Sequence, residues 1–164
     1  MISVMLVAPQ SDLPWVAVEV DTIASMDGLR VRLVRTPATL RSVTDAISHY
    51  GACDVLVFSA HGGESGIVLD DGQISAADVL MLVEMVRCRL VILNSCSSIS
   101  IAGDVVKITR ADCICTINEQ PDRRAWQVST GVLRELVRGG GPVQAFMRTA
   151  RHDRNSQYLR SLID

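Results

Sequence analysis

The sequence predicts an α/β fold, namely a three-layer α/β/α sandwich with a mostly parallel central sheet. Short apolar runs alternate with stretches whose apolar residues recur at helical spacing, which is typical of such sandwiches. Hydrophobic residues make up 48% of the 164 residues, and the mean hydropathy is +0.27, as expected for a sheet buried on both faces. We expect one domain over residues 1–152, followed by a polar C-terminal tail over residues 153–164 that frays.

The first fifty residues predict two strands and two helices. Residues 2–8 form the first expected strand, and a helix follows from near Asp12. The apolar stripe of this helix consists of Leu13, Val16, Val20 and Ile23. Apolar residues alternate with arginines over 29–34, which predicts an edge strand with one solvated face. Thr36-Pro37 predicts the start of the second helix, with proline at the first helical position.

The rest of the chain continues the alternation of strands and helices. An Asp71-Gly72 turn within residues 66–74 predicts a small hairpin, and Ser75 with Asp78 predicts a capping-box start to the next helix. The later expected elements are a helix over 98–109, a strand over 112–117, a long helix opening at Pro121 and a last helix opening at Pro142.

Composition excludes several classes of function. A net charge of −2 and an aromatic content of 4% argue against a nucleic-acid-binding surface. No apolar run approaches the ~20 residues that a membrane-spanning helix needs, and the start of the chain lacks the basic segment of a signal peptide. The five cysteines are odd in number and lack metal-ligand spacing. We therefore expect reduced thiols, a cytoplasmic location, and neither a metal nor a cofactor.

Two polar turns carry the chemistry of this sequence. His61 follows the apolar run 55–58, and Cys96 follows the apolar run 90–93. Open α/β sheets place their active sites at the carboxyl ends of their strands, so we expect the two residues side by side at this edge. Cysteine and histidine together are the minimum set for nucleophilic catalysis by a thiolate.

The residues around the two turns suggest a role for each group. The strand-to-helix turn places Cys96 near a helix N-terminus, which favours the thiolate, and His61 can accept and return its proton. The backbone amides of Gly62 and Cys96 are the expected donors to a tetrahedral oxyanion. Either Ser59 or Asn94 orients the imidazole or polarises the site, and the sequence does not choose between them.

The order of these motifs resembles a known family. Ser-Ala-His-Gly after one strand, an Ile-Val-Leu-Asp-Asp-Gly hairpin, a helix, and Asn-Ser-Cys-Ser-Ser after the next strand resemble the CHAT peptidases, caspase-like enzymes of clan CD. The likeness covers residues 52–151, including the closing helices. It implies a caspase-haemoglobinase fold, a His61–Cys96 dyad, and cleavage of a protein or peptide after a residue chosen by one deep pocket.

The resemblance leaves the specificity of cleavage open. In the related metacaspases an acidic residue two positions before the nucleophile helps to bind a basic side chain, and here that position holds the uncharged Asn94. Glu119 or Asp122, beyond the last parallel strand, replaces such a residue only in part. The resemblance also implies a regulatory partner protein and a role in a bacterial conflict or defence pathway.

Two other classes of protein remain as alternatives. The first is an interaction module that keeps a CHAT-like fold with an idle dyad and binds a partner protein. The second is a flavodoxin-like ligand binder, which is the weaker alternative because the chain lacks a Gly-x-Gly-x-x-Gly or Walker sequence. The segment Pro9-Gln10-Ser11-Asp12, where a phosphate loop would lie, contains no glycine.

Overall fold

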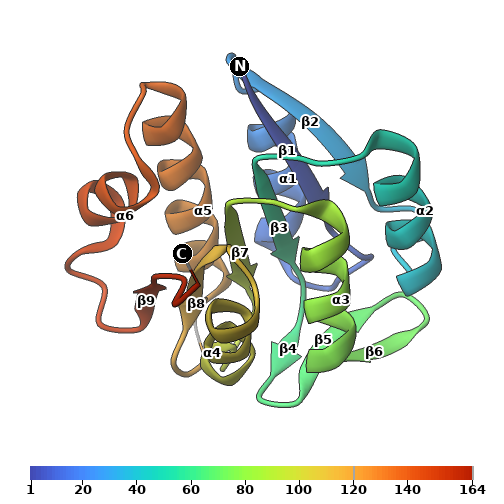
Figure 1. The fold of residues 1–164 in the computed structure, drawn as a ribbon. Coiled ribbons are helices and arrows are strands. Elements are labelled where there is room, and N and C mark those ends of the chain that lie inside the picture. The colour runs from blue at the N-terminus through green and yellow to red at the C-terminus, as the bar shows by residue number, and fades with distance from the viewer. Residues whose placement is uncertain (120, 164) are drawn as a thin grey trace.

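The computed structural model describes residues 1–119 and 121–163, and it has the predicted α/β/α sandwich (Figure 1). The six-stranded central sheet has the order β2-β1-β3-β7-β8-β9, in which β9 alone runs antiparallel to its neighbour. Its strands are β1 (Ile2–Val7), β2 (Leu29–Val34), β3 (Val55–Ser59), β7 (Leu90–Asn94), β8 (Asp112–Thr116) and β9 (Ser156–Leu159). The strands β3 and β7 are neighbours at the centre of the sheet, so the turns that follow them meet at one edge.

Helices cover both faces of the sheet. One face packs against α1 (Pro14–Ala24), α5 (Asp122–Val137) and α6 (Pro142–Ala150), and the other packs against α2 (Leu40–Tyr50), α3 (Ala76–Val86) and α4 (Ile99–Ile108). Alternate residues of each central strand enter opposite clusters: Leu56 and Phe58 lie on the α2–α4 side, whereas Val55 and Val57 lie on the α1–α5 side. Burial on both faces explains why the strand sequences are continuous apolar runs.

The predicted hairpin belongs to a second, three-stranded sheet, formed by β4 (Gly62–Gly63), β5 (Gly66–Leu69) and β6 (Gly72–Ser75). Leu69 pairs with Gly72, so Asp70 and Asp71 form the tight turn, one residue earlier than expected. The carboxylate of Asp70 accepts hydrogen bonds from the amides of Gln10 (2.8 Å) and Ala38 (2.7 Å). These bonds fix the hairpin against the loops that follow β1 and β2.

Local capping decides where two of the helices begin. The expected start of α2 at Thr36-Pro37 is wrong, because the helix begins at Leu40 with Thr39 as its N-cap. The Ser42 amide donates to the Thr39 hydroxyl (3.0 Å) and the Thr39 amide donates to the Ser42 hydroxyl (2.8 Å), which satisfies donors that a helix start leaves free. The predicted Ser75–Asp78 capping box of α3 is confirmed.

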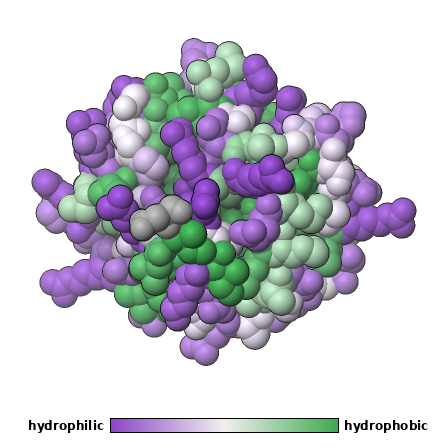
Figure 2. Space-filling view, in the orientation of Figure 1, coloured by the Kyte–Doolittle hydropathy of each residue, from purple (hydrophilic) through white to green (hydrophobic). Residues whose placement is uncertain are grey.

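The surface carries apolar side chains beside the C-terminal segment. The amide of Leu162 donates to the carbonyl of Val106, which places this segment against α4. Ile108, Leu162 and Ile163 are exposed there, and Figure 2 shows apolar atoms gathered over this side of the molecule. Within the described ranges, every helix is too short or too polar to cross a membrane.

The two edge strands of the central sheet are β2, which the sequence predicts, and β9, which it does not. β2 is an edge strand as predicted, although Leu33 is among its exposed side chains, so the alternation of its faces is incomplete.

The expectation of a frayed tail after residue 152 is wrong over β9, which pairs with β8 from Cys113 to Thr116. The hydroxyl of Tyr158 and the amide of Ser161 both donate to the carboxylate of Asp112. Burial and the bond to Asp112 raise the pKa of Tyr158.

Replacing Tyr158 by phenylalanine tests whether this segment is part of the folded domain. The variant keeps the ring that packs near Phe146 and loses the hydrogen bond to Asp112. We expect Tyr158→Phe to lower the free energy of unfolding by about 1 kcal/mol, measured by urea denaturation. Tyr50→Phe, at an exposed ring on α2, is the matched control and is expected to be neutral. Equal stability of both variants and the unmodified protein would contradict the packing of β9.

Candidate active site

The site lies where the turns after β3 and β7 touch. Ser59 is paired with Asn94 at the last position of the two strands, and the Ala60 amide donates to the Asn94 carbonyl (3.4 Å). A Cβ atom on Gly62 would lie 2.7 Å from the Cβ of Ser95, closer than real side chains approach. Glycine at this position therefore allows the turn carrying His61 to pack directly on the turn carrying Cys96.

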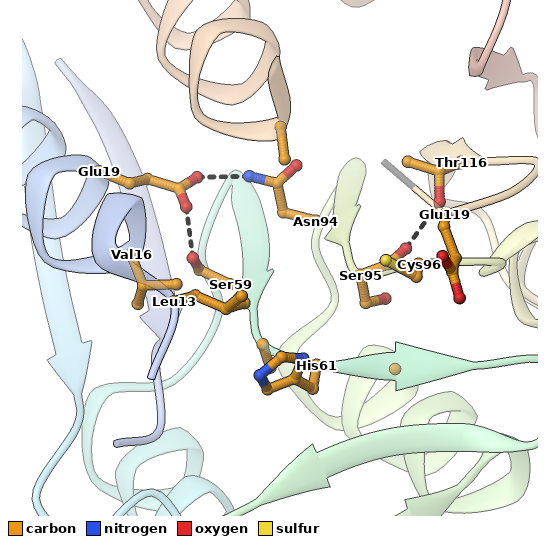
Figure 3. Close-up of a pocket in the computed structure, with 13 residues that line it drawn as sticks. Leu13, Val16, Glu19, Ser59, His61, Asn94, Ser95, Cys96, Thr116 and Glu119 are labelled. Atoms are coloured by element: carbon orange, nitrogen blue, oxygen red, sulfur yellow. Dashed lines mark hydrogen bonds between the residues drawn. The ribbon is translucent and has the colours of Figure 1, made fainter. Parts of the chain in front are cut away.

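A cavity of about 310 Å³ opens between these turns (Figure 3). Its wall includes the predicted site residues Ser59, His61, Gly62, Asn94, Cys96 and Glu119. The expectation that His61 and Cys96 stand at one sheet edge is thus confirmed in position. The side chain of Asp122, another predicted candidate, lies outside the described part of the structure.

The turn that carries Cys96 is fixed to the end of β8. The Thr116 hydroxyl donates to the Ser95 carbonyl (2.7 Å), and the Ser97 amide donates to the Asn118 carbonyl (3.2 Å). Ser97 adopts a left-handed backbone conformation (φ 50°), which a non-glycine residue adopts at a cost. These contacts hold the backbone around Cys96 in a defined shape before any ligand binds.

Cys96 differs from the other four cysteines in its surroundings. It is partly exposed on the cavity wall, whereas the other four are buried. Burial raises the pKa of the thiol to about 11 for Cys53 and to about 12 for Cys88 and Cys115, and it raises the pKa of Cys113 well above the ordinary value. These four thiols therefore stay protonated near neutral pH, and Cys96 is the accessible candidate nucleophile.

His61 contacts a carboxylate that the sequence analysis did not assign to the site. Nε2 of His61 lies 2.8 Å from Oδ1 of Asp12, in the loop between β1 and α1. Among the described residues, no hydrogen bond joins the imidazole to the Cys96 thiol. The bond to His61 is the main cause that lowers the pKa of Asp12, so this carboxyl is ionised at neutral pH and can only accept. It follows that Nε2 is the donor in this contact, and Nδ1 is the ring nitrogen that Asp12 does not contact.

The amide of Gly62, a predicted oxyanion donor, is not part of the hydrogen-bond ladder between β4 and β5. The Val68 amide donates to the His61 carbonyl (2.8 Å), and the next pair along the two strands is Gly62 with Ile67. Hydrogen-bonded and non-hydrogen-bonded residue pairs alternate along an antiparallel ladder. Because His61 and Val68 are a hydrogen-bonded pair, Gly62 and Ile67 are a non-hydrogen-bonded pair, and the Gly62 amide is directed away from β5. This amide lies next to the turn that carries the Cys96 amide, as the close approach of Gly62 to Ser95 requires.

Glu19 is the principal residue that the sequence analysis missed. Its side chain is only 2% exposed, and it lines the cavity from α1. Its carboxylate accepts hydrogen bonds from the hydroxyls of Ser59 and Ser129 and from Nδ2 of Asn94 (2.7 Å), and Figure 3 draws the bonds to Ser59 and Asn94. A signal was present in the sequence, since Glu19 falls within the apolar stripe Val16, Val20 and Ile23. A carboxylate at a buried helical position calls for polar partners from elsewhere in the fold.

Of the two roles predicted for Ser59 and Asn94, the described contacts do not include orientation of the imidazole, and polarisation of the site stays a prediction. Both side chains bind Glu19, so the structure gives neither of them a contact that orients the imidazole. The contact to the imidazole comes from Asp12 instead.

Comparison with known families agrees with this geometry. Residues 4–113 match the CHAT domain family, a segment that runs from β1 into β8 and contains both His61 and Cys96. The chain therefore belongs to the CHAT domain family, which is a caspase-like protease family. A search of curated proteins found no match.

Alkylation by iodoacetamide at neutral pH tests whether the thiol of Cys96 reacts faster than the other four thiols. We expect Cys96 to be modified first, because the other four thiols are buried and protonated. Peptide mapping by mass spectrometry identifies the modified residue, and Cys96→Ser is expected to remove the fast phase of labelling. Earlier labelling of any other cysteine in the folded protein would contradict the assignment.

The Asp12–His61 contact predicts a shift that NMR can measure. In His61→Ala, the pKa of Asp12 is expected to rise toward the ordinary value for aspartate, because its main hydrogen bond is lost. Folding lowers the pKa of Asp12, so the contact with His61 stabilises the folded protein at pH values above the pKa that Asp12 has in the unfolded chain. This stabilisation is lost as the pH falls through the pKa of Asp12 in the folded protein. His49→Ala is the control, and an Asp12 pKa that is the same in both variants would contradict the contact.

Proposed function

We propose that this chain is a cysteine endopeptidase in which Cys96 is the nucleophile and His61 is the general base and acid. The observation that supports this most strongly is the shared cavity, whose wall contains the two residues at the ends of neighbouring parallel strands. Membership of a caspase-like protease family supports the same chemistry. The substrate class is a protein or peptide.

The proposed reaction begins with transfer of the Cys96 proton to Nδ1 of His61, the ring nitrogen that Asp12 does not contact. The thiolate attacks the peptide carbonyl carbon, and a bond forms between sulfur and carbon while the carbonyl oxygen becomes an oxyanion. The amides of Gly62 and Cys96 donate to this oxyanion. The imidazolium then protonates the leaving amine as the carbon–nitrogen bond breaks, and water hydrolyses the remaining thioester with His61 again as the base.

Asp12 is the proposed positioning residue for His61. A carboxylate on Nε2 fixes the tautomer that presents Nδ1 to the thiol, and it stabilises the imidazolium after proton transfer. In the described part of the structure, the thiol and the imidazole are not hydrogen-bonded. Catalytic contacts that are loose in a free enzyme commonly tighten in the substrate complex. Substrate, or a regulatory partner protein, is the proposed cause of that tightening here.

The cellular setting is part of the proposal and follows from the family resemblance. We place the enzyme in the cytoplasm as a regulated effector of a bacterial conflict or defence pathway. Four buried thiols that remain unpaired are consistent with a reducing compartment.

A binding module with an idle dyad is the second candidate function. One observation favours it: Nε2 of His61 is held by Asp12, and no hydrogen bond joins the ring to Cys96 among the described residues. A module of this kind would bind its partner protein equally well with Cys96 intact or replaced. Cleavage assays separate the two candidates directly.

Replacement of the dyad tests the proposed enzyme. We expect Cys96→Ala to abolish peptide cleavage and His61→Ala to lower kcat/KM by about 10² to 10⁴, the usual contribution of a general base. The activity is measured with a mixed peptide library and read by mass spectrometry. His49→Ala, at an exposed position on α2, is the matched control and keeps full activity. Undiminished cleavage by either dyad variant would overturn the proposal.

A further inference from the structure

The strand β2 lies at one outer edge of the central sheet (Figure 1). All of its residues, Leu29–Val34, pair with β1 on its inner side, and no other strand of the described structure adjoins it. Natural proteins commonly protect an edge strand from further pairing with a proline, with a bulge, or by keeping the strand very short. β2 contains no proline and forms an unbroken ladder with β1 along its whole length, so it has none of these three protections.

The outer side of β2 carries backbone groups that can form hydrogen bonds. The Ala8 amide donates to the Val34 carbonyl (3.0 Å) at the end of the ladder with β1. Alternate residues of a parallel strand bond to opposite sides, so the even-numbered residues of β2 bond to β1. The amides and carbonyls of Val31 and Leu33, the odd-numbered residues inside the strand, are therefore directed outward and are available to an added strand.

One face of this edge is positively charged. Arg30 and Arg32 lie two positions apart on β2 and line a small cavity of about 120 Å³ together with Tyr50, the last residue of α2. The guanidinium of Arg32 lies 4.4 Å from the centre of the Tyr50 ring, which holds this side chain on the α2 side of the sheet. Neither arginine forms an ion pair with another described residue. Both charges are therefore available to a bound group.

The opposite face of the edge is apolar. Leu33 is 44% exposed there, and Leu29 and Val31 on the same face pack against the core cluster that includes α1. The side chains of an added strand alternate between the two faces, so every second residue would lie on the arginine side and the others on the Leu33 side. Acidic residues are complementary to the first face and apolar residues to the second.

We infer that the outer edge of β2 binds an extended acidic segment of a partner protein, which adds to the sheet as a further strand. Backbone hydrogen bonds to Val31 and Leu33 provide affinity, and carboxylates beside Arg30 and Arg32 provide selectivity. A second copy of this chain is disfavoured, because antiparallel pairing of two β2 strands sets arginines beside arginines on one face of the joined sheet. The inference concerns this edge alone and does not rest on the proposed peptidase.

Two short synthetic peptides, each blocked at both ends, test the inference on the unmodified protein. One alternates glutamate with valine, and the other alternates lysine with valine. Binding is followed through the backbone amide signals of the protein in NMR spectra. We expect the glutamate peptide to shift the signals of Val31 and Leu33 and to bind at least about tenfold more tightly than the lysine peptide, because opposite charges on neighbouring strands attract and like charges repel. Equal binding of the two peptides, or shifts confined to other parts of the chain, overturns the inference.

A third peptide distinguishes strand addition from simple charge attraction. Methylation of every backbone nitrogen of the glutamate peptide removes its backbone donors and keeps its carboxylates. We expect this peptide to lose most of the shift at Val31 and Leu33, and undiminished binding would overturn strand addition. A shift of the same signals with protein concentration alone, in the absence of peptide, would show that a second copy occupies the edge and would overturn the acidic partner.

Reversal of the two charges provides the residue-level test. The variant that combines Arg30→Glu with Arg32→Glu is expected to bind the lysine peptide more tightly than the glutamate peptide. Arg41→Glu is the control and keeps the original preference, because this side chain is 91% exposed on α2 and does not line the cavity. A folded double variant that still prefers the glutamate peptide overturns the inference. If the double variant unfolds, as shown by circular dichroism, the comparison of the peptides on the unmodified protein decides the matter.

Discussion

The buried carboxylate of Glu19 is the interaction on which the geometry of the site depends. It accepts hydrogen bonds from Ser59 at the end of β3, from Asn94 at the end of β7, and from Ser129 on α5. These elements are far apart in the sequence, and a buried polar group is stable only when such partners satisfy it. Loss of this network would free the two strand ends that lead to His61 and Cys96.

The site therefore combines a rigid wall with a less constrained dyad. Glu19 and the contacts of the Cys96 turn with β8 fix the backbone, whereas the imidazole is half exposed and is held by Asp12. In the proposed peptidase, movement of His61 toward Cys96 completes the dyad while the wall keeps its shape. The same arrangement explains why an idle binding module is the natural competing account.

The sequence predicted the parts of the fold that depend on local pattern. The apolar runs 55–58 and 90–93 became neighbouring buried strands, and their polar turns met at one edge. β9 was missed because its mixed Ser-Gln-Tyr-Leu sequence pairs only with the outer edge of β8. Asp12 and Glu19 were missed because their partners lie 40 to 110 residues away along the chain, so only the folded chain brings them together. The α2 start was misplaced because the Thr39–Ser42 capping box outweighed the proline signal.

A crystal structure of the protein after reaction with a peptidyl chloromethyl ketone would test the proposed role of Cys96 most directly. We predict a covalent bond from the reagent to the sulfur of Cys96, with the carbonyl oxygen of the reagent beside the amides of Gly62 and Cys96, in the cavity that these residues line. Attachment to another residue, or a Cys96 that stays unmodified, would contradict the proposal.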